Sequence, residues 1–199
     1  MAVSNGTRGI FAGGSTPSIT NLIDFITIAQ TGNATDFGDL AVTMSDGGRS
    51  QSPTRGIIAG GRISPGSTRI NNINFITIAT TGNAIDFGDL TLARNEPASD
   101  SNQIRGIFAG GQTPATEVID FITITTTGDA VDFGDTSVAC ASGRGSANPT
   151  RFVFNLGSPS ASTIEFVEIM STGDSTDFGD LTTSRDQAAG ASNAHGGLG

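Results

Sequence analysis

The sequence predicts an all-β protein, a four-bladed β-propeller with antiparallel blades. One pattern occurs four times in 199 residues, beginning RGIFAGG at Arg8, RGIIAGG at Arg55, RGIFAGG at Arg105 and RFVFNLG at Arg151. The starting arginines are 47, 50 and 46 residues apart, and helical periodicity is absent. Repeats of about 40 to 50 residues that contain several short strands are typical of propeller blades, which bury their apolar faces only by stacking on one another.

Each repeat contains three clear strands, as the second repeat illustrates. The first is the apolar run 56–59, which ends at two glycines that tolerate positive φ. The second, at 73–79, is rich in β-branched and aromatic residues. A Thr-Gly-Asn turn at 81–83 leads into a third strand that carries Phe87.

A fourth, weaker strand is expected in the polar stretch 95–103, before Arg105 begins the next repeat. The strand at 23–28 carries apolar residues on both of its faces. Because side chains alternate between the faces of a strand, a sheet with two apolar faces must be covered on both sides. Blades packed between neighbouring blades satisfy this requirement.

We expect one propeller domain over residues 1–199, with repeat units at about 8–54, 55–104, 105–150 and 151–199. Ser192 to His195 occupies the same place in the cycle as Ser4 to Thr7. The simplest interpretation is a ring closed by pairing of the N- and C-terminal segments, in which residues 186–198 supply a strand missing from the first blade. The alternatives are an eight-bladed ring formed by two chains, which would make the protein a homo-oligomer, and a piece of a longer array.

Composition limits the classes of partner and chemistry. The 10 basic residues, all arginine, are outnumbered by 19 acidic residues, and the net charge of −9 argues against nucleic acid as a partner. Neither a signal peptide nor a stretch of about 18 apolar residues is present, so membrane insertion is not expected. A single cysteine, Cys140, excludes an internal disulfide framework and a multi-cysteine metal site. The only histidine, His195, has no nucleophile and acid at a recognisable spacing, so no catalytic residues are assigned.

The repeat resembles the kelch repeat. The shared features are the double glycine that ends a strand, the apolar strand after a variable loop, and an aromatic residue followed by leucine and arginine, as in Phe87, Leu90 and Arg94. Kelch repeats usually carry Trp and Tyr, and this chain has Phe in their place. The variant with GIFAGG, IDFITI and DFGDL resembles the kelch-like arrays encoded by marine bacteriophages. The resemblance covers nearly the whole chain.

The resemblance implies a non-enzymatic viral structural or adhesion module, located in the virion as part of a phage tail, fibre or capsid decoration. Its partners would then be other virion proteins or a host-surface receptor. The alternative is a cellular kelch-like module that binds carbohydrate or protein. An enzyme of the galactose-oxidase kind is excluded, because its copper chemistry needs Tyr and several His, and this chain has no Tyr and one His.

The DFGD motif is shared with the magnesium-binding segment of protein kinases, but it occurs four times and without the other kinase motifs. Its acids fall at steps of three, which gives a weak alternative of calcium binding by oxygen ligands. The residues concerned are Asp129, Asp132, Asp135, Asp174, Asp177 and Asp180. Since a buried Phe within the stretch prevents all three side chains from pointing one way, we favour turn capping, with no metal and no cofactor.

Two further sets of residues hold a fixed place in the repeat. The first set predicts four equivalent ion pairs, or arginine-to-backbone contacts, that link strands or blades. It comprises Arg8, Arg55, Arg105 and Arg151 with Asp39, Asp89, Asp135 and Asp180. The second position holds Arg94 and Arg185 in the second and fourth repeats, but Met44 and Cys140 in the others. We interpret this alternation as drift.

The loops after the double glycines differ between repeats, at 15–21, 62–72, 112–116 and 158–162. Variable loops on a constant scaffold are typical of recognition surfaces. Arg62 and Arg69, in the longest of these loops, are the candidate residues for contacting an acidic group of a ligand.

Overall fold

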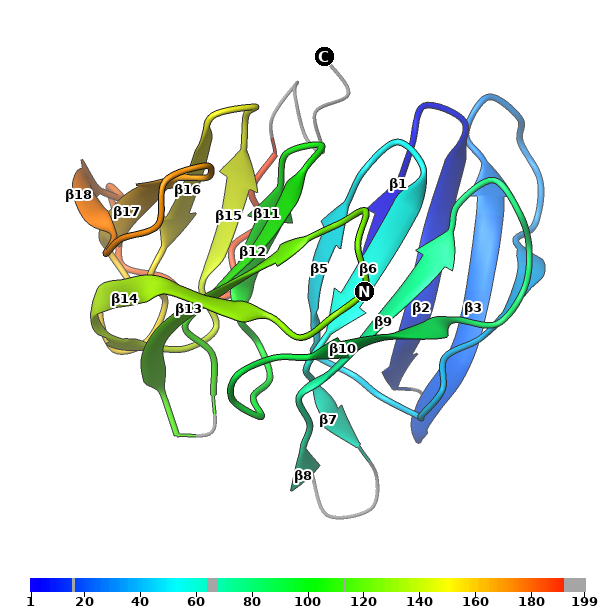
Figure 1. Ribbon diagram of the computed structural model, residues 1–199, viewed down its shortest axis with the longest axis horizontal. Helices are drawn as coiled ribbons and strands as arrows, with labels where there is room; N and C mark the ends of the chain where they lie inside the picture. The colour runs from blue at the N-terminus through cyan, green and yellow to red at the C-terminus, as the bar shows by residue number, and fades with distance from the viewer. Residues whose placement is uncertain (16, 64–67, 113, 192–199) are drawn as a thin grey trace.

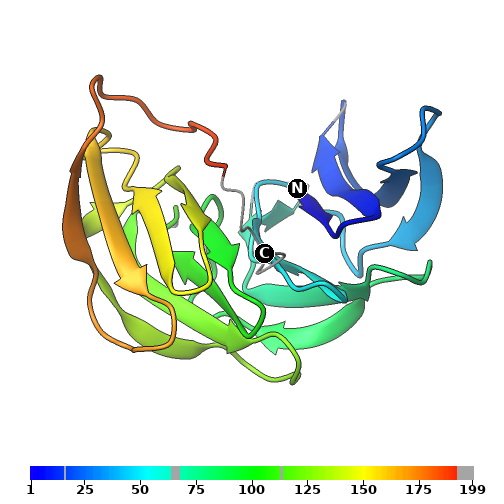
Figure 2. The same cartoon turned by 90° about the horizontal axis from the view of Figure 1, so that it is seen from above.

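The computed structural model describes residues 1–15, 17–63, 68–112 and 114–191, and these residues form strands, turns and loops without a helix. Four four-stranded antiparallel sheets form a four-bladed β-propeller. The sheets follow one another along an arc, with the first and last sheets at its two ends (Figures 1 and 2). The predicted fold class is therefore confirmed.

Each blade contains four strands, and the second blade carries an extra hairpin that projects from one rim (Figure 1). The first blade contains β1 (Ala2–Ser4), β2 (Arg8–Ser15), β3 (Ile19–Thr27) and β4 (Thr35–Asp39). The second contains β5 (Gly48–Gln51), β6 (Arg55–Ala59), β9 (Asn72–Thr77) and β10 (Ile85–Asp89), with the hairpin β7 (Arg62–Ile63) and β8 (Thr68–Arg69). The third contains β11 (Ala98–Ser101), β12 (Arg105–Ala109), β13 (Thr116–Thr123) and β14 (Val131–Cys140). The fourth contains β15 (Arg144–Ala147), β16 (Arg151–Asn155), β17 (Thr163–Glu168) and β18 (Thr176–Asp180).

The weak fourth strand is the inner strand of each blade. It precedes the repeat arginine, so the blades begin one strand earlier than the repeat units. The inner strands β1, β5, β11 and β15 lie next to one another in that order. Most of their side chains are small or polar, as in the sequences AVS, GRSQ, ASDS and RGSA. Such side chains suit strands that lie close together around the propeller axis.

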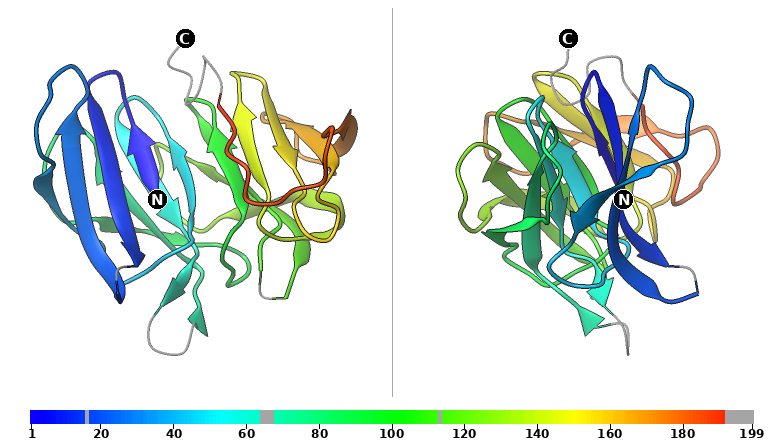
Figure 3. Two further views of the ribbon diagram at one scale, coloured as in Figure 1. Left: turned by 180° about the vertical axis from the view of Figure 1, so that it is seen from behind. Right: turned by 90° about the vertical axis from the view of Figure 1, so that its right-hand side faces the viewer.

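The expectation that residues 186–198 supply a strand missing from the first blade needs correction. The first blade has its inner strand from its own sequence, because residues 2–4 pair with Gly9, Ile10 and Phe11 of β2. Residues 186–191 form no strand, and residues 192–198 lie outside the described residues. The segment after β18 crosses the fourth blade towards the axis, where Gly190 and Ala191 line a cavity together with residues 2–4 (Figure 3).

Three apolar clusters fill the three junctions between successive blades. Each contains the phenylalanine of a DFGD motif packed against the two central strands of the next blade. These residues, Phe37, Phe87 and Phe133, are each 3% exposed. Burying such a side chain stabilises the fold by about 1.5–3 kcal/mol. The blades are therefore held together by repeated apolar contacts, as the two-faced strands predict.

The backbone of the DFGD motif is bonded to the Thr-Gly-Asn turn of the next blade. At the first junction the amide of Gly82 donates to the carbonyl of Phe37 (2.7 Å), and the amide of Ala84 donates to the carbonyl of Asp39 (2.8 Å). A Cβ on Gly38, which has a φ of 144°, would lie 2.5 Å from the carbonyl of Gly82. The two most regular motifs of the sequence therefore recur because they meet each other across every junction.

Candidate binding site at the propeller axis

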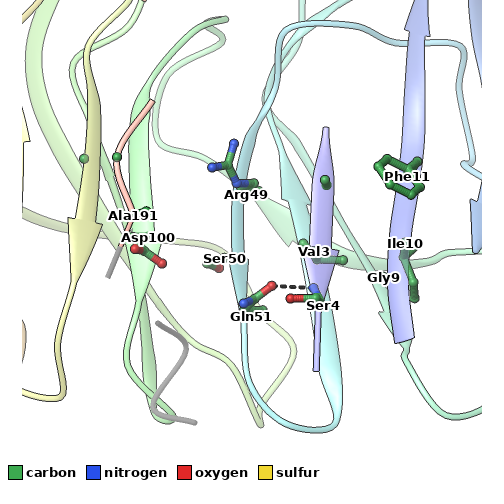
Figure 4. A pocket seen from close by; sticks show the side chains of 13 residues that line it. Val3, Ser4, Gly9, Ile10, Phe11, Arg49, Ser50, Gln51, Asp100 and Ala191 are labelled. Carbon is green, nitrogen blue, oxygen red and sulfur yellow. Dashed lines mark hydrogen bonds between the residues drawn. The ribbon is translucent and has the colours of Figure 1, made fainter. Parts of the chain in front are cut away.

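A cavity of about 430 Å³ lies on the propeller axis, lined by residues of all four inner strands. Figure 4 shows the side chain of Gln51 in β5 next to Ser4 of β1, whereas Ser50 extends to the other side of β5, where Asp100 of β11 lies.

Hydrogen bonds between inner strands hold the wall of this cavity. The Oε1 of Gln51 accepts the amide of Ser4 at 2.6 Å, as Figure 4 shows. The hydroxyl of Ser101 donates to the carbonyl of Gln51 at 2.7 Å, and the carboxylate of Asp100 accepts the amide of Ala147 at 2.8 Å. These bonds run from β1 through β5 and β11 to β15, so the wall is organised before any ligand arrives.

Three arginines converge at one mouth of the axis, around a second cavity of about 390 Å³. Arg49 comes from β5, Arg62 from β7 and Arg144 from β15, and Asp46 lies among them. The Nε of Arg62 is 2.6 Å from the Oδ2 of Asp46. We call these three arginines the axial arginines.

The Arg144 guanidinium lies partly buried among other charged groups. Burial lowers the pKa of Arg144 from its ordinary value, and the nearby Arg49 acts in the same direction, whereas Glu96 and Asp46 raise this pKa. Guanidinium groups remain protonated at ordinary pH even with such shifts. The mouth therefore offers planar, permanently charged donors that can bind a carboxylate through paired hydrogen bonds.

Of the two arginines that were predicted to contact a ligand, Arg62 lies at the mouth and Arg69 does not line it. Arg62 and Arg69 face each other across the β7–β8 hairpin. Arg62 lines the mouth, but the Nε of Arg69 donates to the Oδ1 of Asn95 at 3.2 Å, away from it. Arg49 and Arg144 were missed because the sequence placed inner strands only as weak, polar stretches, without showing which side chains face the axis.

The first three repeat arginines contact the backbone of the next blade. The Nη1 of Arg8 donates to the carbonyl of Ile78 at 3.0 Å. In the same way, Arg55 donates to the carbonyl of Ile124 at 2.9 Å, and Arg105 donates to the carbonyl of Ile169 at 3.2 Å. Each guanidinium also lies over a phenylalanine of its own blade, at 4.3 to 4.6 Å from the ring centroid. Arg151 in the last blade instead pairs with Glu168 of its own blade at 2.5 Å.

The DFGD aspartates do not form the predicted ion pairs with the repeat arginines in the described part of the chain. The ion pairs of the described residues are Arg62–Asp46, Arg94–Asp120 and Arg151–Glu168, and none involves Asp39, Asp89, Asp135 or Asp180. Asp129 and Asp174, named for the calcium alternative, each accept the backbone amide of a DFGD aspartate at 3.0 Å. In the described part of the chain no three His, Cys, Asp or Glu side chains gather as a metal site would require.

A fully buried ion pair links the second and third blades. The Nη2 of Arg94 is 2.8 Å from the Oδ2 of Asp120, and both side chains are 0% exposed. Asp120 also accepts the hydroxyl of Thr91 at 2.6 Å. The interpretation of the Arg94 position as drift is therefore wrong, because this arginine has a buried partner in the next blade. The signal that could have found it is the pair of differences from the first junction, where Met44 and Asn74 stand in place of Arg94 and Asp120.

The lone cysteine lies in the core at the third junction. Burial raises the pKa of the Cys140 thiol to about 11, so at neutral pH it is an unreactive apolar side chain. His195 lies outside the described residues.

Comparison of the chain with protein-family models and with curated proteins gave no match. The described residues contain no helix with the length and apolarity needed to cross a membrane.

Proposed function

We propose that this protein is a non-enzymatic, kelch-like binding module of a phage virion, and that it holds a carboxylate-bearing segment of a partner protein at the propeller axis. The observation that carries the proposal is the convergence of Arg49, Arg62 and Arg144 at the mouth of the axis. Asp46 is the acid among the residues found to line the mouth, and Glu96 lies close enough to Arg144 to raise its pKa. Three guanidinium groups thus meet two carboxylates, which leaves donors for an incoming acid.

A binding role is favoured over a catalytic one by the kinds of side chain at the axis. The two axial cavities are lined by Arg, Asp, Ser and Gln with glycines and apolar residues. Among the described residues that line them, no nucleophile is paired with a general base, which acyl or glycosyl transfer would need. The wall is rigid, since hydrogen bonds join the inner strands, and a rigid wall lowers the entropy lost when a ligand binds.

The partner would be another virion protein or a host-surface receptor. The viral part of the proposal is supported by the GIFAGG, IDFITI and DFGDL motifs and their resemblance to phage arrays. Mass spectrometry of purified virus particles tests it. Detection in particles is the expected result, whereas presence only in uninfected cells would favour the cellular carbohydrate- or protein-binding module.

The binding site is tested by fluorescence anisotropy with a labelled peptide rich in Asp and Glu. We expect saturable binding that weakens as salt is added, because charged contacts are screened. R49Q should weaken binding about tenfold or more, as expected for losing a charge-assisted contact. R69Q is the matched control, since Arg69 points away from the mouth. Equal affinity of R49Q and the wild type would overturn the proposed site.

A further inference from the structure

The two ends of the arc carry faces that are buried elsewhere in the molecule. Phe178 of the fourth blade is 56% exposed, although the equivalent Phe37, Phe87 and Phe133 are each 3% exposed. At the other end, Phe11 and Ile28 of the first blade are 51% and 54% exposed. Their equivalents in the later blades are almost fully buried. The residues equivalent to Phe11 are Ile58, Phe108 and Phe154, and those equivalent to Ile28 are Ile78, Ile124 and Ile169. Figure 2 shows these two blades at the ends of the arc.

The backbone groups at the two ends match as well. Within each of the three junctions, the turn glycine of the next blade donates to the carbonyl of the DFGD phenylalanine at 2.7 Å. The corresponding groups at the ends are the amide of Gly32 and the carbonyl of Phe178, which no hydrogen bond joins among the described residues. One end therefore carries the acceptor half of a blade junction, and the other carries the donor half.

The charges of the two end faces are complementary. Arg185 holds the same place in the fourth repeat as Arg94 in the second, and Asp24 holds the same place in the first repeat as Asp120 in the third. Thr182 likewise matches Thr91, which donates to Asp120. Both Arg185 and Asp24 are exposed and lie on opposite end blades. A fourth junction built like the second-to-third one would pair them.

We propose that a second copy of this chain covers these faces, so that the fourth blade of each copy packs on the first blade of the other. Two copies then form one eight-bladed ring with two identical junctions, each containing an Arg185–Asp24 ion pair. Such a dimer is closed by a twofold axis and leaves no face uncovered. It also preserves the three junctions inside each chain, whereas closure within one chain would have to bring the two ends of the arc together. The proposal does not depend on the proposed function.

The alternation of arginine along the repeats follows from this arrangement. Arginine occurs in the second and fourth repeats, and the acids that it meets are in the third repeat and in the first repeat of the other copy. The first and third repeats carry Met44 and Cys140, which pack in apolar clusters. In the complete ring every second junction then has a buried ion pair, and at the third junction the matching acid, Glu165, is buried and accepts the hydroxyls of Ser137 and Ser175 instead.

The test is the molar mass in solution, measured by size-exclusion chromatography with light scattering. We expect the wild type to have twice the 20.1 kDa mass of one chain. R185E and D24R should each place like charges in the junction and raise the dimer dissociation constant about tenfold or more. Because both positions are exposed in the single chain, the far-ultraviolet circular dichroism of both variants should match that of the wild type.

Mixing the two variants distinguishes dimerisation from closure within one chain. In a mixed pair, one junction joins the two substituted positions and the other joins the two native ones, so both again join an acid to an arginine. Equimolar R185E and D24R should therefore restore the dimer, which closure within a chain could not do. D86R, which makes the same charge change at an exposed position of β10, should remain dimeric.

Three outcomes would overturn the proposal. They are a wild type that keeps the mass of one chain, a mixture of variants that stays monomeric, and a mass that grows with concentration beyond two chains. The last of these would indicate an open filament built from the same faces.

Discussion

Replacing Arg94 with methionine should weaken the junction between the second and third blades. Arg94 and Asp120 are both fully buried and 2.8 Å apart. Loss of one partner leaves the other as an uncompensated buried charge, which costs about 3–5 kcal/mol. For a chain of this size, each kcal/mol lowers the melting temperature by about 2–4 °C. R94M should therefore melt roughly 6 to 20 °C below the wild type.

The first junction supplies the matched double variant. There, Met44 and Asn74 occupy the positions of Arg94 and Asp120, and both are buried. R94M/D120N copies this combination, so neither partner remains as an unpaired charge. Because removing both members of a buried ion pair is often nearly neutral, the double variant should recover most of the stability that either single substitution loses.

Thermal unfolding followed by circular dichroism, with urea unfolding as a second measurement, gives the coupling energy of the double-mutant cycle. R69M is the control, since it makes the same chemical change on the hairpin, where Arg69 donates hydrogen bonds to Asn95 and Gln112. The reasoning is refuted if R94M melts at the temperature of the wild type, or if the costs of R94M and D120N simply add in the double variant.

Three other predictions concern single positions. Arg105→Ala removes a hydrogen bond to the fourth blade and a cation–π contact, so the free energy of unfolding should fall by about 1–2 kcal/mol; an unchanged urea midpoint would exclude this role. Gly88→Ala should destabilise the single chain more than Gly179→Ala does. Both glycines have positive φ, but only at Gly88 would a Cβ meet backbone, 2.4 Å from the carbonyl oxygen of Gly128. Equal melting temperatures of the two variants would contradict this. The Cys140 pKa is raised by burial from 9.0 to about 11, so its stabilising contribution is present below pH 9 and is lost as pH rises through about 11. Since the chain has neither Lys nor Tyr, C140A should flatten the dependence of stability on pH in that window, and identical curves would count against the shift.

Much of the blade could be predicted because its signals are local. The double glycine, the apolar run at 73–79 and the Thr-Gly-Asn turn each specify a conformation from neighbouring residues alone. The inner strands gave a weaker signal. Their residues are small and polar, so the stretch 95–103 predicted a strand without showing that β11 lies beside the axis.

The candidate site could be predicted only in part. Arg62 was selected because it lies in a variable loop, and it does line the mouth of the axis. Its neighbours Arg49 and Arg144 are almost a hundred residues apart in sequence, and they meet because β5 and β15 both lie at the centre of the propeller. A contact of this kind depends on the curvature of the whole array, which no single repeat encodes.

The sequence by itself determined that this protein is an array of four similar antiparallel sheets, because period, turns and two-faced apolar strands are properties of the chain read locally. The sequence also shows that Arg94 and Arg185 hold matching positions in two repeats, but it does not show what either side chain contacts. Only the tertiary structure decided that the first of these is a buried partner of Asp120 and that the second lies exposed on an end blade. The physical reason is that an ion pair depends on which blade lies next to which, and that is fixed by the stacking of the blades.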